Sequence, residues 1–325
     1  MSTSGAHAKG TTFEPSKYPP FPKDIPTVKL DTFSFAELQQ GDEALQDRLF
    51  HACKERGFFY LGLNGSDMSS MQRDCDDIAR LAEKVFELPE EEKEKFPMRG
   101  SLFGIIIQEK ELLRRHMANA HSIGMKIMSI LATKIGLPED EFEQYHRLTE
   151  ESGDHIRMTR GPPRATAHLP EIQTPGHTDF GTITILFNWL GGLQMWSEPS
   201  RGSFDNVVDP DVTAKSHSEA EKPRWLWVEP PPPNHAIVNL GDAAVKFTGG
   251  LFCSGRHRVV PAPGEQGRFD RYSIVYFVRP EDKAVLRRLQ APGIPKNGAV
   301  EEENEITAKE WINKQAQGLG YSIPQ

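Results

Sequence analysis

The chain has 325 residues, of which 37% are hydrophobic and 26% charged, with 38 basic and 46 acidic side chains and a net charge of −8. This composition is typical of a globular protein with a hydrophobic core, and it excludes a disordered chain, a coiled coil and a collagen-like repeat. No run of about 18 apolar residues occurs, so no membrane span is expected. The acidic balance argues against a nucleic-acid partner, which usually requires a basic face.

Residues 1–17 lack the charged start, apolar middle and small-residue cleavage site of a secretory signal, and we expect them to form a disordered leader. Three widely spaced cysteines, Cys53, Cys75 and Cys253, are too few for a disulfide framework. They favour a reducing, cytoplasmic location. Cys53 and Cys75 fall in helical stretches, where small buried apolar residues are expected.

The first half of the chain mixes helical and strand patterns. The longest predicted helix carries apolar residues at three- or four-residue steps, as in a helix packed on a core. His116, His121 and His146 fall in these helical regions and are expected to be solvated or to cap helix ends. The predicted strands are residues 27–30 and 58–61, and the predicted helices are residues 42–55, 66–86, 90–95 and 110–135.

From about His155 onward, short β-rich runs alternate with glycine and proline clusters. Several short strands at close spacing with turn signals favour a sandwich or a barrel. The tail at residues 301–317 is again predicted to be helical. The strands predicted in this half are residues 182–187, 225–228, 236–240 and 271–278.

One segment of this β-rich half carries a metal-binding pattern. His177 and Asp179 are two residues apart, so on an extended strand both side chains project from the same face. A lone pair of this kind often arises by chance. His257, which lies 78 residues after Asp179, is the candidate third ligand. Two imidazoles and one carboxylate on one face are typical of non-haem Fe(II), with open positions for a bidentate cosubstrate and O2.

A second pattern strengthens this interpretation. Arg271 and Ser273 begin the apolar run RYSIVYFV and share one strand face. A guanidinium fork and a hydroxyl there could hold a carboxylate through charge-assisted hydrogen bonds. A surface arginine on an edge strand is the alternative, but an unpaired charge in so apolar a strand would be costly.

Five motifs in this order carry a resemblance to a known family. The sequence resembles the 2-oxoglutarate and Fe(II)-dependent dioxygenases of the isopenicillin-N-synthase-like group, in particular fungal members that act on small catabolic or secondary metabolites. The resemblance extends from Ile25 to about Pro280. The motifs are His177-Thr-Asp179 with Phe-Gly-Thr-Ile-Thr after it, Gly191-Gly-Leu-Gln194, Asn239-Leu-Gly-Asp242, His257-Arg-Val-Val and Arg271-Tyr-Ser273.

The resemblance implies a mainly β fold, a double-stranded β-helix (jelly roll) with helices around it and an α+β N-terminal region. His177, Asp179 and His257 would hold Fe(II) and form the catalytic centre. Arg271 and Ser273 would bind the distal carboxylate of the cosubstrate 2-oxoglutarate. With O2, the enzyme would hydroxylate or desaturate a small-molecule metabolite and release succinate and CO2. Halogenating relatives lack the carboxylate that Asp179 supplies here, so halogenation is disfavoured.

On this basis the chain is expected to form one structural unit with five segments. A disordered leader (1–17) precedes an N-terminal α+β region (18–107) and supporting helices (108–150). The jelly-roll oxygenase core (151–285) and a C-terminal helical segment (286–325) complete the chain.

Two features depart from the family pattern. Relatives often carry a tyrosine before a Pro-Pro pair that reaches the cosubstrate, and Gly161 stands at that position here. The link between Phe103 and Gln108 is also shorter than the loop that helps to cover the site in relatives. The lid is therefore unusually small, or a part of that loop is missing from the sequence.

Three other functions share parts of this pattern. An Fe(II) oxidase of the same fold would use Arg271 and Ser273 for the carboxylate of its own substrate, and it would release no succinate. A non-catalytic jelly-roll protein that binds a small ligand has no need of two histidines and an aspartate with open sites. Zinc-dependent hydrolysis would not need the Arg-x-Ser pair. The identity of the substrate and the oligomeric state are not encoded in any readable motif.

Overall fold

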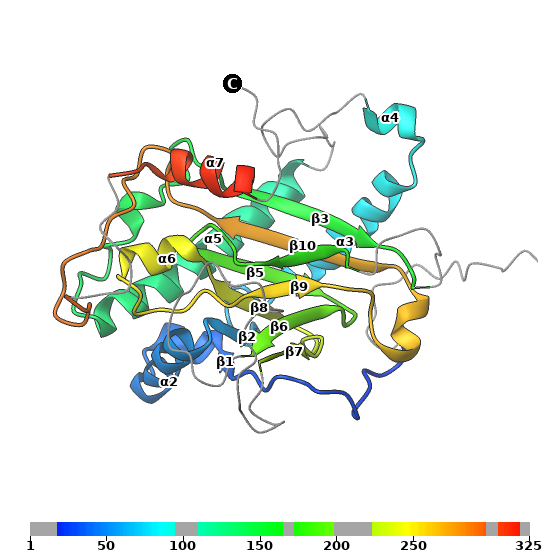
Figure 1. The fold of residues 1–325 in the computed structure, drawn as a ribbon, viewed down its shortest axis with the longest axis horizontal. Helices are drawn as coiled ribbons and strands as arrows, with labels where there is room; N and C mark the ends of the chain where they lie inside the picture. Colours follow the sequence, from blue (N-terminus) through cyan, green and yellow to red (C-terminus); the bar gives the residue numbers. More distant parts are fainter. Residues whose placement is uncertain (1–17, 95–109, 165–171, 198–222, 297–304, 319–325) are drawn as a thin grey trace, which may run out of the picture.

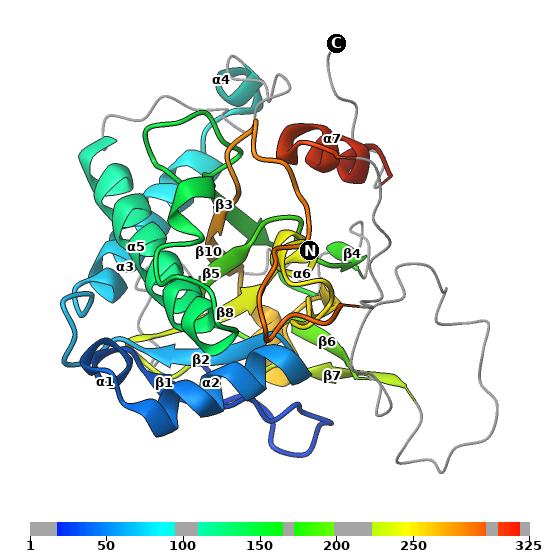
Figure 2. The same ribbon diagram turned by 90° about the vertical axis from the view of Figure 1, so that its left-hand side faces the viewer.

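The computed structural model describes residues 18–94, 110–164, 172–197, 223–296 and 305–318. Two β-sheets face each other, and a layer of helices covers the outer side of the larger sheet (Figures 1 and 2). In Figure 2 the helices α3 (Met71–Phe86) and α5 (Lys110–Lys134) lie on one side of the large sheet, and β4, β6 and β7 of the smaller sheet lie on the other. This arrangement is the jelly roll with external helices that the sequence predicts.

The larger sheet has six strands in the order β1-β2-β8-β5-β10-β3, and every neighbouring pair is antiparallel except β1 with β2. The strand β10 lies between β5 and β3, so its residues are interior to the sheet. The bounds are β1 (Thr32–Ser34), β2 (Phe58–Gly62), β3 (His155–Gly161), β5 (Ile183–Asn188), β8 (His235–Leu240) and β10 (Arg271–Val278).

The smaller sheet has four antiparallel strands in the order β4-β9-β6-β7. The register between β4 and β9 shifts through an irregularity between Thr174 and His177, and this shift sets His177 opposite His257. The bounds are β4 (Thr174–His177), β6 (Leu193–Ser197), β7 (Arg224–Trp227) and β9 (His257–Val259).

The helices pack mainly on the outer face of the larger sheet. Gly124 allows α5 to approach closely, because a Cβ there would lie 3.0 Å from Ile183 and 3.1 Å from Val278. A larger residue at this position would require these side chains or the helix to shift. The remaining helices are α1 (Phe35–Gln40), α2 (Glu43–Glu55), α4 (Glu90–Glu94), α6 (Asp242–Phe247) and α7 (Ala308–Gly318), with 3-10 turns at Glu143–Tyr145 and Gly264–Arg268.

Strand alternation divides the core into two parts. On β2, Phe59 and Leu61 face the helices and join the large outer cluster, whereas Phe58 and Tyr60 face the second sheet and join a smaller inner cluster. The same alternation places Leu186 of β5 in the inner cluster. The space between the two sheets is therefore packed at one end by apolar side chains, and the polar groups described below occupy the rest of the inner face.

Most predicted elements are confirmed with small shifts in their bounds. Thr27 forms only an isolated bridge to Trp227, and the strand expected at residues 27–30 is found instead at β1. The second helix begins at Met71 rather than Ser66. The leader, the link at residues 103–108 and the start of the predicted tail helix lie outside the described residues. The boundaries of the five predicted segments stay a prediction.

The three helix-region histidines contradict the expectation of solvated or capping side chains. His116 and His146 are 0% and 2% exposed, and His121 is buried against Asp154. One ring nitrogen of His146, Nδ1, lies 2.7 Å from the carbonyl oxygen of Phe142, and Nε2 lies 2.7 Å from Oγ1 of Thr182. All three are buried in the core, although Nε2 of His116 has no hydrogen-bond partner among the described residues, so helical periodicity alone did not distinguish them from surface residues.

Acid should destabilise the fold through His116 and His146. Burial lowers the pKa of each imidazole to about 4, whereas a histidine in the unfolded chain has a pKa of about 6.5. Between these values the unfolded chain binds more protons. The free energy of unfolding should therefore fall as the pH drops from about 6.5 towards 4, by roughly 1 kcal/mol per histidine and pH unit.

The thermal midpoint as a function of pH measures this slope. His146→Gln removes one of the buried histidines that titrate on unfolding and keeps a donor and an acceptor, so its slope should be shallower than that of the wild type. An identical slope in the variant would show that His146 does not titrate on unfolding.

The described part of the chain contains no helix with both the length and the apolar character needed to cross a membrane.

Candidate metal centre

The two sequence-predicted histidines come from neighbouring strands. His177 is the last residue of β4, and its register partner on β9 is His257. Their ring centroids are 4.4 Å apart. Asp179 lies just past the end of β4 and is 6% exposed. The fold thus brings together two histidines that are far apart in the sequence, because the pairing register of β4 with β9 sets them opposite each other.

The three side chains converge through defined atoms. Oδ1 of Asp179 is 3.7 Å from Nε2 of His177 and 3.8 Å from Nε2 of His257. One ligand atom from each residue lies within 4.8 Å of the other two, a separation that suits a shared metal ion. All three residues named by the sequence pattern are therefore placed together, with the candidate ligand atoms facing one another.

Neighbouring groups orient each candidate ligand. Oδ2 of Asp179 accepts hydrogen bonds of 2.7 Å from Oγ1 of Thr184 and Nδ2 of Asn239, which leaves Oδ1 directed at the histidines. Nδ1 of His177 lies 2.8 Å from the carbonyl oxygen of Pro175 and donates to it, and this leaves the Nε2 lone pair free. Partners that fix the ring and the tautomer in this way are typical of metal-binding histidines.

His257 follows the same pattern, with Nδ1 3.0 Å from the carbonyl oxygen of Gly255. Sequence reasoning did not identify Thr184 or Asn239 as supporting residues, although Asn239 stands in one of the five motifs.

The protonation states suit a divalent cation. Burial, and next the neighbouring His257, lower the pKa of His177 to about 4, so its imidazole is neutral at physiological pH. Burial alone would raise the pKa of Asp179. The two histidines and the hydrogen bonds from Asn239 and Thr184 outweigh burial and hold that pKa below its usual value. Neutral imidazoles and an ionised carboxylate are the forms that bind metal, and this donor set fits non-haem Fe(II).

The predicted carboxylate-binding pair lies on the inner face of the larger sheet. Arg271 and Ser273 are 3% and 4% exposed. Nε of Arg271 donates to the carbonyl oxygen of Gly191 at 2.8 Å, and Nη1 lies 3.4 Å from Oγ of Ser273. Oγ of Ser273 is in turn 2.5 Å from Oγ1 of Thr159. Because β10 is interior to the sheet, the alternative of a surface arginine on an edge strand is wrong.

Arg271 is a buried cation that has no counter-ion in the part of the chain that the structure describes. Burial lowers the pKa of its guanidinium to about 10, and no carboxylate of the described residues lies within 4.0 Å of it. Retaining an unpaired charge inside a protein is costly unless a partner arrives. The guanidinium is therefore a complementary site for an anion such as a carboxylate.

The position of the missing tyrosine lies beside this arginine. Gly161 is the register partner of Arg271 on β3, so a side chain there would share the face that carries Arg271. A Cβ at Gly161 would overlap the side-chain amide of Gln173. Gln173 thus occupies the space that a side chain at position 161 would enter. The sequence offered no signal for this, because Gln173 precedes β4 and lies twelve positions beyond Gly161.

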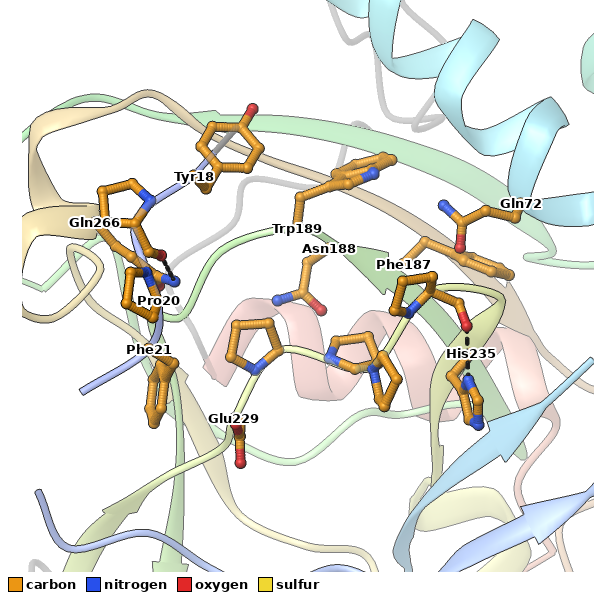
Figure 3. Close-up of a pocket in the computed structure, with 15 residues that line it drawn as sticks. Tyr18, Pro20, Phe21, Gln72, Phe187, Asn188, Trp189, Glu229, His235 and Gln266 are labelled. Atoms are coloured by element: carbon orange, nitrogen blue, oxygen red, sulfur yellow. Dashed lines mark hydrogen bonds between the residues drawn. The ribbon is translucent and has the colours of Figure 1, made fainter. Parts of the chain in front are cut away.

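A separate pocket of about 180 Å³ lies elsewhere in the fold (Figure 3). Its lining includes Phe187, Trp189 and the proline run at 230–233. Figure 3 shows Phe187, Asn188 and Trp189 together with Glu229 and His235, the residues on either side of that run and Asn234. None of the three candidate metal ligands lines it, and neither does Arg271. This pocket does not coincide with the candidate metal centre.

Two family models match the chain. Residues 25–127 match the N-terminal region of the non-haem dioxygenases in morphine synthesis, and residues 152–280 match the 2OG-Fe(II) oxygenase superfamily. All five site residues predicted from the sequence fall in the second match.

Curated relatives agree with these models. A 2-oxoglutarate-dependent dioxygenase of Aspergillus fumigatus is 29% identical, over 90% of this chain and 86% of the relative. The 2-oxoglutarate-dependent dioxygenase iboH of Amanita muscaria is 39% identical over 51% of this chain and 69% of the relative.

Solved structures share the fold. Neurospora crassa T7H in complex with alpha-KG aligns with a TM-score of 0.69 and 18% identity, covering 88% of this chain and 95% of that one. A dioxygenase for auxin oxidation from rice aligns with a TM-score of 0.62 and 16% identity, covering 90% and 96%. The chain belongs to the 2-oxoglutarate- and Fe(II)-dependent dioxygenases, the family to which its motifs, its jelly roll and its relatives all lead.

Proposed function

We propose that His177, Asp179 and His257 bind the catalytic Fe(II), and that Arg271 and Ser273 bind the distal carboxylate of 2-oxoglutarate. The convergence of the three ligand atoms carries this assignment. The buried guanidinium of Arg271 on the inner face, which has no carboxylate partner among the described residues, supports the second part. Iron(II) held there with 2-oxoglutarate supplies the oxidising chemistry, in which O2 is reduced as the cosubstrate loses CO2 and becomes succinate.

The residues of the chain orient the reactants. Asp179 presents one carboxylate oxygen because Thr184 and Asn239 hold the other. Three protein ligands leave room at the metal for the keto-acid end of the cosubstrate and for O2. The guanidinium of Arg271 fixes the far end of the cosubstrate, which sets its register relative to the metal. With Asp179 in place, hydroxylation or desaturation of a small-molecule substrate is the proposed outcome.

Succinate release tests this function. The protein is incubated with Fe(II), 2-oxoglutarate and a panel of small metabolites, and the protein with Asp179→Asn provides the background. Substrate-dependent succinate, with a product that gains one oxygen or loses two hydrogens, is the expected result. Product without succinate would favour the oxidase that uses Arg271 for its own substrate. No product and no succinate would favour a ligand-binding protein.

We also propose a cytoplasmic location and a role with small metabolites. No disulfide bond joins Cys53, Cys75 and Cys253, which all lie in the described residues, and this supports the reducing cytoplasm as the location. The curated fungal relatives support a role with small metabolites, as in secondary metabolism.

The replaced tyrosine leads to a paired prediction. Gly161→Tyr should weaken 2-oxoglutarate binding, because the new side chain would collide with Gln173 beside Arg271. Gln173→Ala removes the obstacle, so the double variant should bind 2-oxoglutarate more tightly than Gly161→Tyr alone. The dissociation constant of 2-oxoglutarate for the four proteins measures this coupling. Additive effects of the two substitutions would show that these positions do not share one space.

A further inference from the structure

A second pair of arginines lies on the inner face near the candidate metal centre. Arg157 of β3 is two residues from Thr159, whose hydroxyl contacts Ser273, so both side chains share the inner face. Arg279 directly follows β10, and a Cβ at Gly181 would lie 3.0 Å from its Cγ. Figure 1 shows β3 and β10 side by side. Neither arginine has a role in the proposed function above.

Both guanidiniums gather around one aromatic ring. The Cζ of Arg157 is 5.2 Å from the ring centroid of Phe277, and the Cζ of Arg279 is 5.7 Å from it. His155 stacks on the same ring at 4.8 Å with an interplanar angle of 23°. Phe277 and Val275 remain partly exposed, whereas their neighbours on the outer face are buried under the helices. The inner face is therefore accessible here.

These arginines lack counter-ions among the residues that the structure describes. No carboxylate lies within 4.0 Å of either guanidinium there, and the buried Nε of Arg279 has no hydrogen-bond partner. Asp154 is adjacent, but its oxygens already accept from Tyr276 Oη, from the backbone N–H of Arg279 and from a ring nitrogen of His121. Burial, and next Arg157, lower the pKa of Arg279 to about 10, so the two cations act on each other.

The cluster is also close to the proposed ligands. Arg157 is among the groups that lower the pKa of His177, and Arg279 acts on Asp179. The charges of the proposed reaction complex, Fe(II), ionised Asp179, the 2-oxoglutarate dianion and Arg271, sum to zero. Arg157 and Arg279 then add two positive charges, and Asp154 and Asp282, which form no ion pair with Arg279 within 4.0 Å, offset only a part of that charge. A substrate that carries negative charge would supply the balance.

We propose that Arg157 and Arg279 bind an anionic oxygen group of the primary substrate, a carboxylate or a phosphate. The inference rests on the proposed function, because it uses the metal centre to identify the inner face as the substrate site. Guanidinium forks match both groups in geometry. The exposed edge of Phe277 between them suits the apolar part of the same molecule.

Binding of small matched probes tests this site without turnover. The protein is loaded with Zn(II) in place of Fe(II) and with 2-oxoglutarate. Each carboxylate probe, from acetate to butyrate and benzoate, is compared by ligand-observed NMR with its neutral amide. Methylphosphonate is the probe that tests whether the site prefers a phosphate group. At least one acid should bind while its amide does not, and a preference for methylphosphonate over acetate would identify a phosphate site.

Variants assign the binding to the two arginines. Arg157→Gln and Arg279→Met should each weaken the bound acid roughly ten- to a hundredfold, as expected for loss of a charge-assisted partner. Arg160→Gln is the matched control, because Arg160 lies on β3 too but pairs with Asp270 at 2.9 Å on the outer face. Arg279→Met should not lower the thermal midpoint, since it removes an unpaired buried charge. A structural role for Arg279 would instead lower it.

The outcomes separate this inference from the proposed function. Affinity for 2-oxoglutarate is measured independently and should be unchanged in Arg157→Gln and Arg279→Met. If the wild type binds no 2-oxoglutarate, the proposed function fails. Three results would refute the anion site while 2-oxoglutarate still binds. In the first, neither an acid nor the phosphonate binds. In the others, the neutral amides bind with the same affinity as the acids, or acid binding is unchanged in Arg157→Gln and Arg279→Met.

Discussion

Asp179→Asn should abolish iron-dependent turnover while leaving the fold intact. Thr184 and Asn239 both donate hydrogen bonds to Oδ2 of Asp179, so the asparagine should direct its carbonyl oxygen to them and its NH2 group at the metal position. An amide nitrogen with two hydrogens is no ligand for Fe(II). Loss of a supporting residue typically costs about 10–100-fold in metal affinity, so loss of a ligand should cost more than about a hundredfold.

Two measurements check this result. Equilibrium iron binding and succinate release should both collapse in Asp179→Asn, while the thermal midpoint of the metal-free protein should stay close to that of the wild type. Asp270→Asn is the control, because Asp270 forms an ion pair with Arg160 away from the metal centre. Normal iron binding in Asp179→Asn would remove Asp179 from the ligand set, and loss of the fold would be visible in the midpoint.

The candidate metal centre could be proposed from the sequence because two of its residues carry metal-binding chemistry at short spacing. His177 and Asp179 were found from one strand periodicity, although the strand ends at His177 and Asp179 lies beyond it. His257 could be named only as a candidate. Its register with His177 depends on the irregular pairing of β4 with β9, and no local pattern encodes that register.

The residues that the sequence did not reveal are those whose role depends on long-range packing. Arg157 and Arg279 are 122 positions apart by number and look like ordinary charged residues beside a strand. Only the pairing of β3 with β10 brings them to one aromatic ring. His116 and His146 likewise look like polar residues on the exposed face of a helix. Another layer of the fold buries them, and local periodicity does not reveal this burial.

Short strands were also hard to predict. The strand expected at residues 27–30 is found at β1, residues 32–34, instead. Only three residues of β1 pair with β2, and residues 27–30 have a similar apolar content, so the sequence does not distinguish the two stretches. Strands β4 and β9 have four and three residues, too few to show an alternation. The long elements α5 and β10 were placed well because sustained periodicity identifies their buried face.

Arg271→Lys should weaken 2-oxoglutarate binding roughly ten- to a hundredfold, because loss of one charge-assisted partner costs about 1.5–3 kcal/mol. Lysine keeps the positive charge but loses the planar fork, so it cannot bind a carboxylate in the bidentate geometry while Nε donates to the carbonyl of Gly191. Ser273→Ala should cost about 1 kcal/mol, as for a neutral hydrogen bond. Iron binding should survive both substitutions, since neither residue is among the proposed ligands.

The dependence of succinate release on 2-oxoglutarate concentration measures these effects, and direct binding separates affinity from turnover. Arg160→Lys is the control on a neighbouring strand. Arg271→Met adds a test of the charge itself: it removes a buried cation that has no counter-ion in the described residues, so the free protein should be at least as stable while cosubstrate binding is lost. A half-saturation concentration unchanged in Arg271→Lys and Arg271→Met would mean that the cosubstrate carboxylate binds elsewhere. The buried guanidinium would then be available to the substrate's own acid, as in the oxidase alternative.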